Sequence, residues 1–231
     1  MALKRFAALW AILFAMAFPL AGETSDPYFC DKENAVLQYT RTTVDGDVKW
    51  YHTMRIGQIV SDTDSVRIEY TSHILNHRGK PYYGDVPAEL VAVIKGGTVI
   101  LNVAESVAAV FRTIFSKNTH IASTGGESSL PVDMAPGDTL PDVYSSVKAL
   151  GMTMKINVTE RQVLRYERIS TPAGEFDCIV VRERKLEKGM GRNRHTVADT
   201  WYARGVGMVR HDTHDKNLKL QTSEILTEMT F

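Results

Sequence analysis

The chain has 231 residues, of which 44% are hydrophobic and 23% charged, values ordinary for a globular protein with a sizeable core. Lysine plus arginine and aspartate plus glutamate each total 27, so the formal charge is zero. A nucleic-acid-binding protein would show a basic excess or basic clusters, and the longest basic stretch, residues 182–194, is interrupted by two glutamates. We therefore expect no nucleic-acid partner.

The first 22 residues have the pattern of a cleaved signal peptide. Lys4 and Arg5 precede an uncharged apolar run over residues 6–20, and Ala21-Gly22 offers small residues for cleavage. The alternative is a retained N-terminal anchor. In the mature chain, residues 23–231, no other apolar run is long enough to span a membrane. Glu23 stands where a lipoprotein would carry its lipidated cysteine. We expect an exported, soluble protein rather than a lipid-anchored one.

Runs typical of β-strands fill residues 34–103. Val66 to Thr71 alternates strictly between apolar and polar residues, as expected of a strand with one buried face. Asp45-Gly46 and Gly96-Gly97 are turn signals between such runs, and the second is typical of a two-residue hairpin loop. This part of the chain is therefore expected to form consecutive hairpins.

Residues 104–115 change period and form the only convincing helix of the mature chain. The apolar residues that recur at three- and four-residue intervals, and so share one helical face, are Val107, Val110, Phe111, Ile114 and Phe115. This face must lie on a sheet as ordinary core, cover a concavity as a lid, or contact a partner. We regard it as the candidate partner or ligand surface.

Residues 117–140 are the least regular part, with one or two edge strands expected between loops rich in glycine and proline. Residues 123–129 have the composition of a phosphate loop, but they lack the lysine and the helical continuation, so a flexible hairpin tip is expected. Residues 143–150 could form a helical turn or a strand.

Alternation returns at Met152 and continues to the C-terminus. Pro172 presets φ for the first central position of a type I turn, and Gly174 can take the positive φ that follows in a bulged hairpin. Gly205 and Gly207 indicate a bulge or bend where a curved sheet turns, or else a site of close ligand approach.

These turn signals divide the mature chain into about ten to twelve strands. Short turns between consecutive strands imply antiparallel pairing, because a parallel sheet would need helical crossovers. So many strands in one sheet should curl into a half-barrel, an open barrel or a sandwich. The expected fold is mostly β: a single domain, residues 23–231, with a large curved antiparallel sheet and one short amphipathic helix.

No linear motif indicates catalysis: there is no Gly-x-Ser-x-Gly, no His-Glu-x-x-His and no phosphate-binding loop. His211-x-x-His214, with Asp212 between, resembles a metal site, but residues three apart on a strand point to opposite faces. We expect no enzymatic activity, no cofactor and no metal.

Cys30 and Cys178 are the only cysteines, and export would permit a disulfide between them. The bond would close a very long loop and stabilise the fold by up to about 5 kcal/mol. The alternative is that both are buried apolar side chains.

Four segments resemble the TapB-like family of exported proteins from Gram-negative bacteria. They are Asp26-Pro-Tyr-Phe29, Thr171-Pro-Ala-Gly-Glu-Phe-Asp-Cys178, Trp201-Tyr-Ala-Arg-Gly-Val-Gly-Met-Val-Arg210 and Leu226-Thr-Glu228. The resemblance implies a periplasmic or outer-membrane location, with one family member associated with type IX secretion. It carries no catalytic residues over to this sequence.

Two functional hypotheses follow. The first is a non-enzymatic periplasmic or outer-membrane-associated accessory that binds another envelope or secretion protein. The second is a carrier of an apolar or lipid ligand, with the helix over residues 104–115 lying as a lid across the mouth of a curved sheet.

Overall fold

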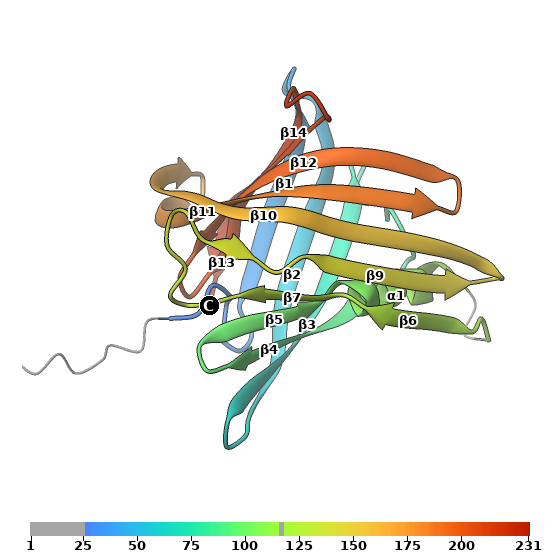
Figure 1. Ribbon diagram of the computed structural model, residues 1–231, viewed down its shortest axis with the longest axis horizontal. Coiled ribbons are helices and arrows are strands. Elements are labelled where there is room, and N and C mark those ends of the chain that lie inside the picture. Colours follow the sequence, from blue (N-terminus) through green and yellow to red (C-terminus); the bar gives the residue numbers. More distant parts are fainter. Residues whose placement is uncertain (1–25, 116–117) are drawn as a thin grey trace, which may run out of the picture.

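The computed structural model describes residues 26–115 and 118–231, so the signal peptide predicted over residues 1–22 lies outside the described residues. Within them, one sheet of fourteen strands curls around a single helix into a nearly closed barrel shape (Figure 1). The helix is α1, Val103–Ile114. The strands are β1 Val36–Thr43, β2 Val48–Ser61, β3 Ser65–Asn76, β4 Ala88–Lys95, β5 Thr98–Asn102, β6 Ile121–Gly125, β7 Glu127–Leu130, β8 Thr139–Leu140, β9 Val143–Ala149, β10 Met152–Thr171, β11 Gly174–Gly189, β12 Arg192–Ala203, β13 Gly207–His214 and β14 Leu220–Thr230.

Neighbouring strands pair antiparallel throughout the sheet, in the order β6-β9-β10-β11-β12-β13-β14-β1-β2-β3-β4-β5-β7, with β8 paired to β10. The prediction of a large, curved antiparallel sheet with one helix is confirmed, and of the three shapes considered the barrel is the one formed. The count of ten to twelve strands was too low. Residues 121–149 contribute four short strands, where only one or two edge strands and an ambiguous segment were expected.

The two edges of the sheet are joined by a single bent stretch of chain. Strands β6 and β7 stand at opposite ends of the pairing order, yet only Gly126 separates them in sequence. Gly126 has φ +93°, and a Cβ there would lie 2.7 Å from the backbone nitrogen of Ala104 and 2.9 Å from Cβ of Ser145. Residues 123–129 are therefore not a hairpin tip. They form the bend that nearly closes the barrel, at a place where only glycine fits.

The buried side chain of Arg161 connects the segments on either side of this bend. Its side chain is only 2% exposed, and its guanidinium donates to the carbonyl oxygens of Pro141 at 3.0 Å and Ser129 at 3.3 Å. The same group pairs with the carboxylate of Glu183 at 3.4 Å. One buried cation thus links β10 and β11 to β7 across the gap between the sheet edges.

Helix α1 begins and ends close to the predicted bounds of 104–115. The Asn102 side chain caps it by accepting from the backbone nitrogen of Glu105 at 2.8 Å, and Val103 donates to the carbonyl of Gly126 at 2.7 Å. Its small-residue face, Ala104 and Ala108, is fully buried against Val147 of β9. The cap and the alanine face fix the helix against the inside of the sheet.

One end of the barrel, which we call the closed end, is covered by residues 26–30. Tyr28, Phe29 and Cys30 are buried there, and Phe29 packs edge-to-face on Tyr70 with ring centroids 5.3 Å apart. This segment contacts the β12–β13 turn, where the backbone nitrogen of Gly205 donates to the carbonyl oxygen of Pro27 at 2.7 Å. Most of the apolar core lies behind this cover.

The turns predicted at the closed end are present. Thr171 pairs with Gly174 around Pro172-Ala173, and Gly174 has φ +136°. Gly205 and Gly207 have φ +67° and +91° in and beside the β12–β13 turn, and the register of the two strands shifts between Trp201 and Tyr202. The sheet turns at these glycines, and a Cβ at Gly207 would lie 3.4 Å from Cα of Phe29.

Candidate functional site

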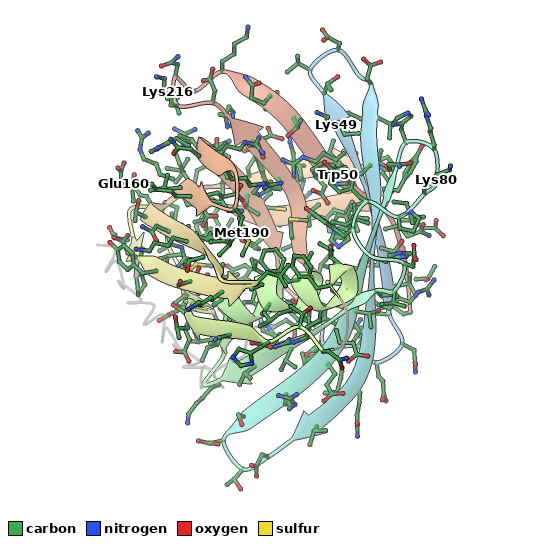
Figure 2. All side chains as sticks on the ribbon, turned by 90° about the vertical axis from the view of Figure 1, so that its right-hand side faces the viewer. Lys49, Trp50, Lys80, Glu160, Met190 and Lys216 are labelled. Carbon is green, nitrogen blue, oxygen red and sulfur yellow. The ribbon has the colours of Figure 1, made fainter. Side chains whose placement is uncertain are left out.

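At the opposite end, which we call the open end, two adjoining cavities lie inside the barrel. One, the apolar cavity, has a volume of about 480 Å³, and the other, the polar cavity, about 350 Å³. They share Tyr83, Lys185, Glu187 and Arg192 as lining residues. Figure 2 looks onto this end, where Met190 lies above the helix and Trp50 lies on the facing wall. The two cavities therefore adjoin at these four residues.

The apolar cavity is lined by the helix face singled out in the sequence. Val107, Val110, Phe111, Ile114 and Phe115 all contribute to it. The facing wall is supplied by strands β4 and β10 and the β11–β12 turn, through Leu90, Met154, Ile156 and Met190. The alanine face of the helix packs on the sheet while the bulkier face borders the cavity, so the helix is both core and lining. Contact of these residues with a ligand or partner stays a prediction.

The polar cavity carries an excess of cationic side chains. Its lining residues include two acids, Glu183 and Glu187, and four cations, Arg41, Lys185, Arg192 and Arg194. Glu187 pairs with Lys185 at 2.9 Å and with Arg192 at 3.0 Å. Burial raises the pKa of Glu183, although Arg161 and Lys185 act against this shift. Arg194 forms no ion pair with any residue that the structure describes, so one cation remains free to bind an anion.

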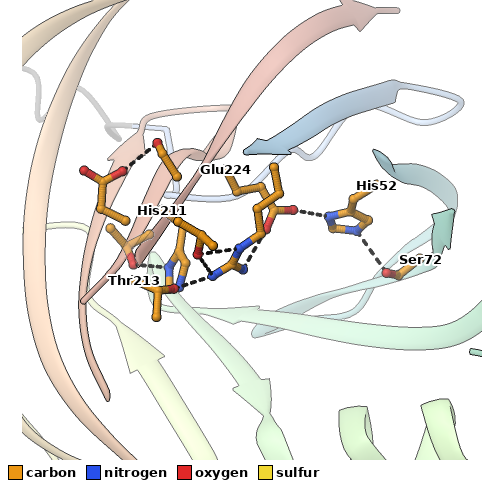
Figure 3. Close-up of polar contacts among 10 residues, drawn as sticks. His52, Ser72, His211, Thr213 and Glu224 are labelled. Atoms are coloured by element: carbon orange, nitrogen blue, oxygen red, sulfur yellow. Dashed lines mark hydrogen bonds and ion pairs between the residues drawn. The ribbon is translucent and has the colours of Figure 1, made fainter. Parts of the chain in front are cut away.

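A hydrogen-bonded network crosses the barrel beside this cavity (Figure 3). Arg41 donates to Glu224 at 3.2 Å, to Thr222 at 2.8 and 2.9 Å and to Thr213, and its guanidinium lies 4.6 Å from the ring centre of Trp50. The Glu224 side chain is 8% exposed. Burial raises the pKa of Glu224, but the hydrogen bond from His52 and the charge of Arg41 act against burial, and the pKa lies below its ordinary value. Glu224 is therefore an ionised carboxylate.

Glu224 continues the network toward β2 and β3. Its Oε1 lies 3.0 Å from Nδ1 of His52, and Nε2 of His52 lies 3.0 Å from Oγ of Ser72. Tyr39 stacks on the His52 ring at 5.2 Å with an interplanar angle of 23°. Ser72 lines the apolar cavity. Strands β14, β2 and β3 thus bring together a carboxylate, an imidazole and a hydroxyl that are far apart in sequence.

His211 stands on the other side of the network. Its Nδ1 lies 2.9 Å from the hydroxyl of Thr200, and burial together with the charge of Arg41 lowers its pKa to about 4. Asp212 is buried on the opposite face of the sheet, where it pairs with Arg210 at 2.7 Å. His211 and Asp212 therefore do not converge, and no metal-binding group of three acids, histidines or cysteines occurs among the described residues.

Both cysteines belong to the core of the closed end. Cys30 and Cys178 are free, buried thiols, so the candidate disulfide is not formed in this structure and the alternative of two buried side chains describes it. Cys178 also borders a surface groove of about 630 Å³ beside Tyr28 and Arg204. Burial raises the pKa of Cys178 to about 12, so this thiol stays protonated and is a poor nucleophile.

Sequence reasoning missed the network of Arg41, His52, Ser72 and Glu224. A signal was present in the alternation of β2, because His52 falls in the inward phase with the buried residues Met54 and Ile56. A polar residue in the buried phase of a strand needs a partner inside the fold. The partner itself lies 172 positions away, and no pattern in the sequence identifies it.

An antiparallel sheet rolled around apolar and polar cavities defines the class: a barrel-shaped β-protein with internal cavities. The family model described as DUF3108-like matches residues 32–226, and the chain belongs to that family. Within the described residues no helix is long and apolar enough to cross a membrane.

Two solved structures share the fold. A protein described as exported, with a YmcC-like fold, from Bacteroides fragilis NCTC 9343 has 18% identity and a TM-score of 0.73, covering 89% of this chain and 100% of its own. A protein described as a lipoprotein, from Parabacteroides distasonis ATCC 8503, has the same identity and TM-score, covering 89% of this chain and 99% of its own. At this identity the likeness concerns the fold alone. No curated protein matches the chain.

Proposed function

We propose that this protein is an exported binding protein that holds an amphipathic ligand, with an apolar chain in the apolar cavity and an acidic group in the polar cavity. The observation that carries the proposal is the junction of the two cavities, which share four lining residues. Concave sites of a few hundred Å³, mostly apolar with a few placed polar groups, are typical of small-molecule binding.

Two unpaired donors border the polar cavity and support an acidic ligand group. Arg194 has no ion-pair partner among the described residues, and the buried Nε1 of Trp50 has no hydrogen-bond acceptor there. A buried donor without an acceptor is costly, and a carboxylate or phosphate oxygen would satisfy it with a charge-assisted bond. Each methylene buried in the apolar cavity would add about 0.8 kcal/mol of binding free energy.

An envelope location follows from three supports. The N-terminal sequence resembles a signal peptide, two solved structures with the same fold are described as an exported protein and as a lipoprotein, and the four sequence segments resemble TapB-like proteins. We propose the periplasm or the periphery of the outer membrane, and a soluble mature chain because Glu23 replaces the lipidated cysteine.

Calorimetric titration with dodecanoate tests this proposal, with dodecanol as the matched ligand that lacks the acidic group. Dodecanoate should bind, and Phe111→Asp should abolish binding because it places a charge against the chain. Arg194→Ala should weaken dodecanoate roughly tenfold and leave dodecanol unchanged. Arg67→Ala, on the outer face of β3, is the control. Equal binding by wild type and Phe111→Asp, or no binding by wild type, would exclude the proposal.

A protein partner is the second candidate, favoured by exposed apolar residues beside the open end. Tyr82 is 46% exposed and Val86 60% exposed, in the connection between β3 and β4. The TapB-like resemblance would make such a partner an envelope or secretion protein. A partner captured by the wild type and lost with Val86→Ser or Val86→Asp, while dodecanoate binding persists, would support this function. Capture unaffected by these changes would count against it.

A further inference from the structure

Ser72, His52 and Glu224 form a linear relay with the spacing of a serine nucleophile and its base. Oγ of Ser72 lies 3.0 Å from Nε2 of His52, and Nδ1 of His52 lies 3.0 Å from Oε1 of Glu224 (Figure 3). The two ring nitrogens face different partners, as they do in hydrolases that use a serine, a histidine and an acid. Such sites are recognised by geometry and not by position in sequence.

The hydrogen-bonding roles in the relay follow from chemistry. An ionised carboxylate only accepts, so Nδ1 of His52 must carry the hydrogen that faces Glu224. In the neutral imidazole Nε2 is then the acceptor, and Ser72 must donate its hydroxyl hydrogen to it. This is the arrangement needed for His52 to remove the proton from Ser72.

The surroundings hold the relay in place. The Tyr39 ring stacks on the His52 ring, and the Tyr39 hydroxyl donates to the carbonyl of Met208 at 3.0 Å, which limits rotation of the imidazole. Arg41 binds the second carboxylate oxygen of Glu224 at 3.2 Å. The relay therefore sits in a fixed network within strands of the sheet, where catalytic geometry is best preserved.

Ser72 is the member of this relay that lines the apolar cavity. It lines that cavity together with Val107, Val110 and Phe111 of the helix. Tyr83 lines the same cavity, and partial burial raises its pKa, so its phenol keeps the proton that it could donate to a developing oxyanion. An ester whose carbonyl group lay at Ser72 would therefore share the cavity with the Tyr83 phenol.

We propose that Ser72 is a nucleophile, activated by His52, that hydrolyses a carboxylic ester with an apolar acyl chain. Oγ of Ser72 attacks the carbonyl carbon while Nε2 of His52 takes the hydroxyl proton. The ester C–O bond breaks, and the alcohol leaves with that proton. Water, deprotonated by His52 in turn, attacks the acyl-serine, releases the fatty acid and restores Ser72. Glu224 is a positioning residue that holds the imidazole. The inference rests on the proposed function, because the fatty acid product is the kind of ligand proposed above.

The expectation of a non-enzymatic protein rested on the absence of linear motifs. A relay assembled from β2, β3 and β14 leaves no linear motif, so that absence does not bear on it. Ser106 provides a matched internal control. It lines the same cavity, but its hydroxyl donates to the carbonyl of Asn102 and bonds no histidine among the residues that the structure describes.

An alkyl fluorophosphonate tests the proposal on the purified protein. Attack by Ser72 on phosphorus expels fluoride, and peptide mapping by mass spectrometry identifies the labelled residue. We expect label at Ser72 and none at Ser106. His52→Gln should slow labelling, and hydrolysis of p-nitrophenyl octanoate, by about 100-fold or more, whereas Arg67→Ala, on the outer face of β3, should change neither. Glu224→Gln should slow labelling, and Glu224→Asp, which keeps the carboxylate, should recover part of the rate.

The outcomes separate this inference from the proposed function. Because mapping uses the wild type, a variant that fails to fold does not obscure the result. Absence of label at Ser72, or equal rates in wild type and a folded His52→Gln, overturns the nucleophile. Dodecanoate binding without labelling leaves the binding function standing alone. Labelling at Ser72 without dodecanoate binding supports the nucleophile and removes the binding function.

Discussion

The two ends of the barrel differ in what fills their interiors. At the closed end, Phe29 and Cys30 are buried in a continuous apolar core, and the segments that cover it meet backbone to backbone, as Gly205 meets Pro27. At the open end the interior holds Arg41, Glu224 and a set of hydroxyl and imidazole groups, bordered by two cavities. One end is packed for stability, and the other holds polar groups that the fold alone does not require.

Three of the four segments that resemble the TapB-like family meet at the closed end. Residues 26–29, 171–178 and 201–210 are far apart in sequence, yet Tyr28, Cys178 and Arg204 line the same groove at the closed end. Arg204 lies over the Tyr28 ring at 4.8 Å and donates to the carbonyl of Val132 at 2.8 Å. These segments mark the packing of the closed end. The residues we propose for function lie outside them.

The largest effect is expected when an anchor of the closed end is truncated. Phe29→Ala removes a ring that is 6% exposed and packs on Tyr70, so the free energy of unfolding should fall by about 3–5 kcal/mol. Tyr82→Ala at the open end removes a half-exposed ring and should cost about 1 kcal/mol or less. Urea denaturation measures both. Equal losses would mean that the two ends contribute alike to stability, which would contradict the view that the closed end stabilises the fold more.

The buried polar groups of the open end should make stability depend on pH. The folded protein takes up a proton on His211 only near pH 4, whereas the unfolded chain does so near its ordinary pKa of about 6.5. The unfolded state thus binds more protons in this window, so stability should fall by about 3 kcal/mol as the pH is lowered from about 6.5 to about 4. The lowered pKa of Glu224 adds a further loss as the pH falls through its folded value.

The measurement is the free energy of unfolding across this range, in wild type and His211→Gln. The variant should show a flatter pH profile, whereas His195→Gln, at an exposed site on β12, should keep the wild-type slope. A His211→Gln profile parallel to that of the wild type would show that the open end is not coupled to pH through this residue.

The sequence predicts the closed end better than the open end for a physical reason. Alternation, paired glycines and the Pro172–Gly174 turn are local signals, because they report backbone conformation over two to ten residues. They located the helix within one residue at each end, whereas the alternation at Val66 to Thr71 marked only the first half of β3. Residues 121–149 escaped because their strands are short, and because Gly125-Gly126 is also typical of a loop.

The network at the open end could not be predicted in the same way. Arg41 and His52 meet Glu224 only because β1 lies between β2 and β14, and Ser72 joins through His52 because β3 lies beside β2. The β1–β14 pairing brings residues 36–43 beside residues 220–230. Such contacts depend on strand order, which local patterns leave undetermined. The helix face was found because its apolar period of 3.6 residues is local. The position of this helix face beside a cavity could not be predicted, because it depends on the arrangement of the whole sheet.

A smaller effect is expected at the β10–β11 turn of the closed end. Gly174 has φ +136°, and a Cβ there would meet only Phe176 ring atoms at 3.9 Å, so Gly174→Val adds backbone strain without a clash. The expected loss is roughly 1–3 kcal/mol of unfolding free energy. Dodecanoate affinity should be unchanged, because the turn lies at the closed end. A loss of affinity equal to that of Phe111→Asp would show that the two ends are coupled.

The smallest effect is expected at helix α1, which has one face packed in the core and another face that borders the apolar cavity. Ala104 and Ala108 hold one face in the core, whereas Phe111 and Ile114 border the cavity and Ile114 is 46% exposed. Amides that depend on half-packed side chains open at a lower free energy than those of a central strand. We expect residues 107–115 to exchange hydrogen faster than the Ile179–Val181 part of β11, which is fully buried. Dodecanoate at ten times its dissociation constant should slow hydrogen exchange of the helix amides by about tenfold. It binds only the state in which the helix is packed on the sheet, so it lowers the population of the opened state. If the helix and the strand are equally protected without ligand, the helix is core and does not act as a lid.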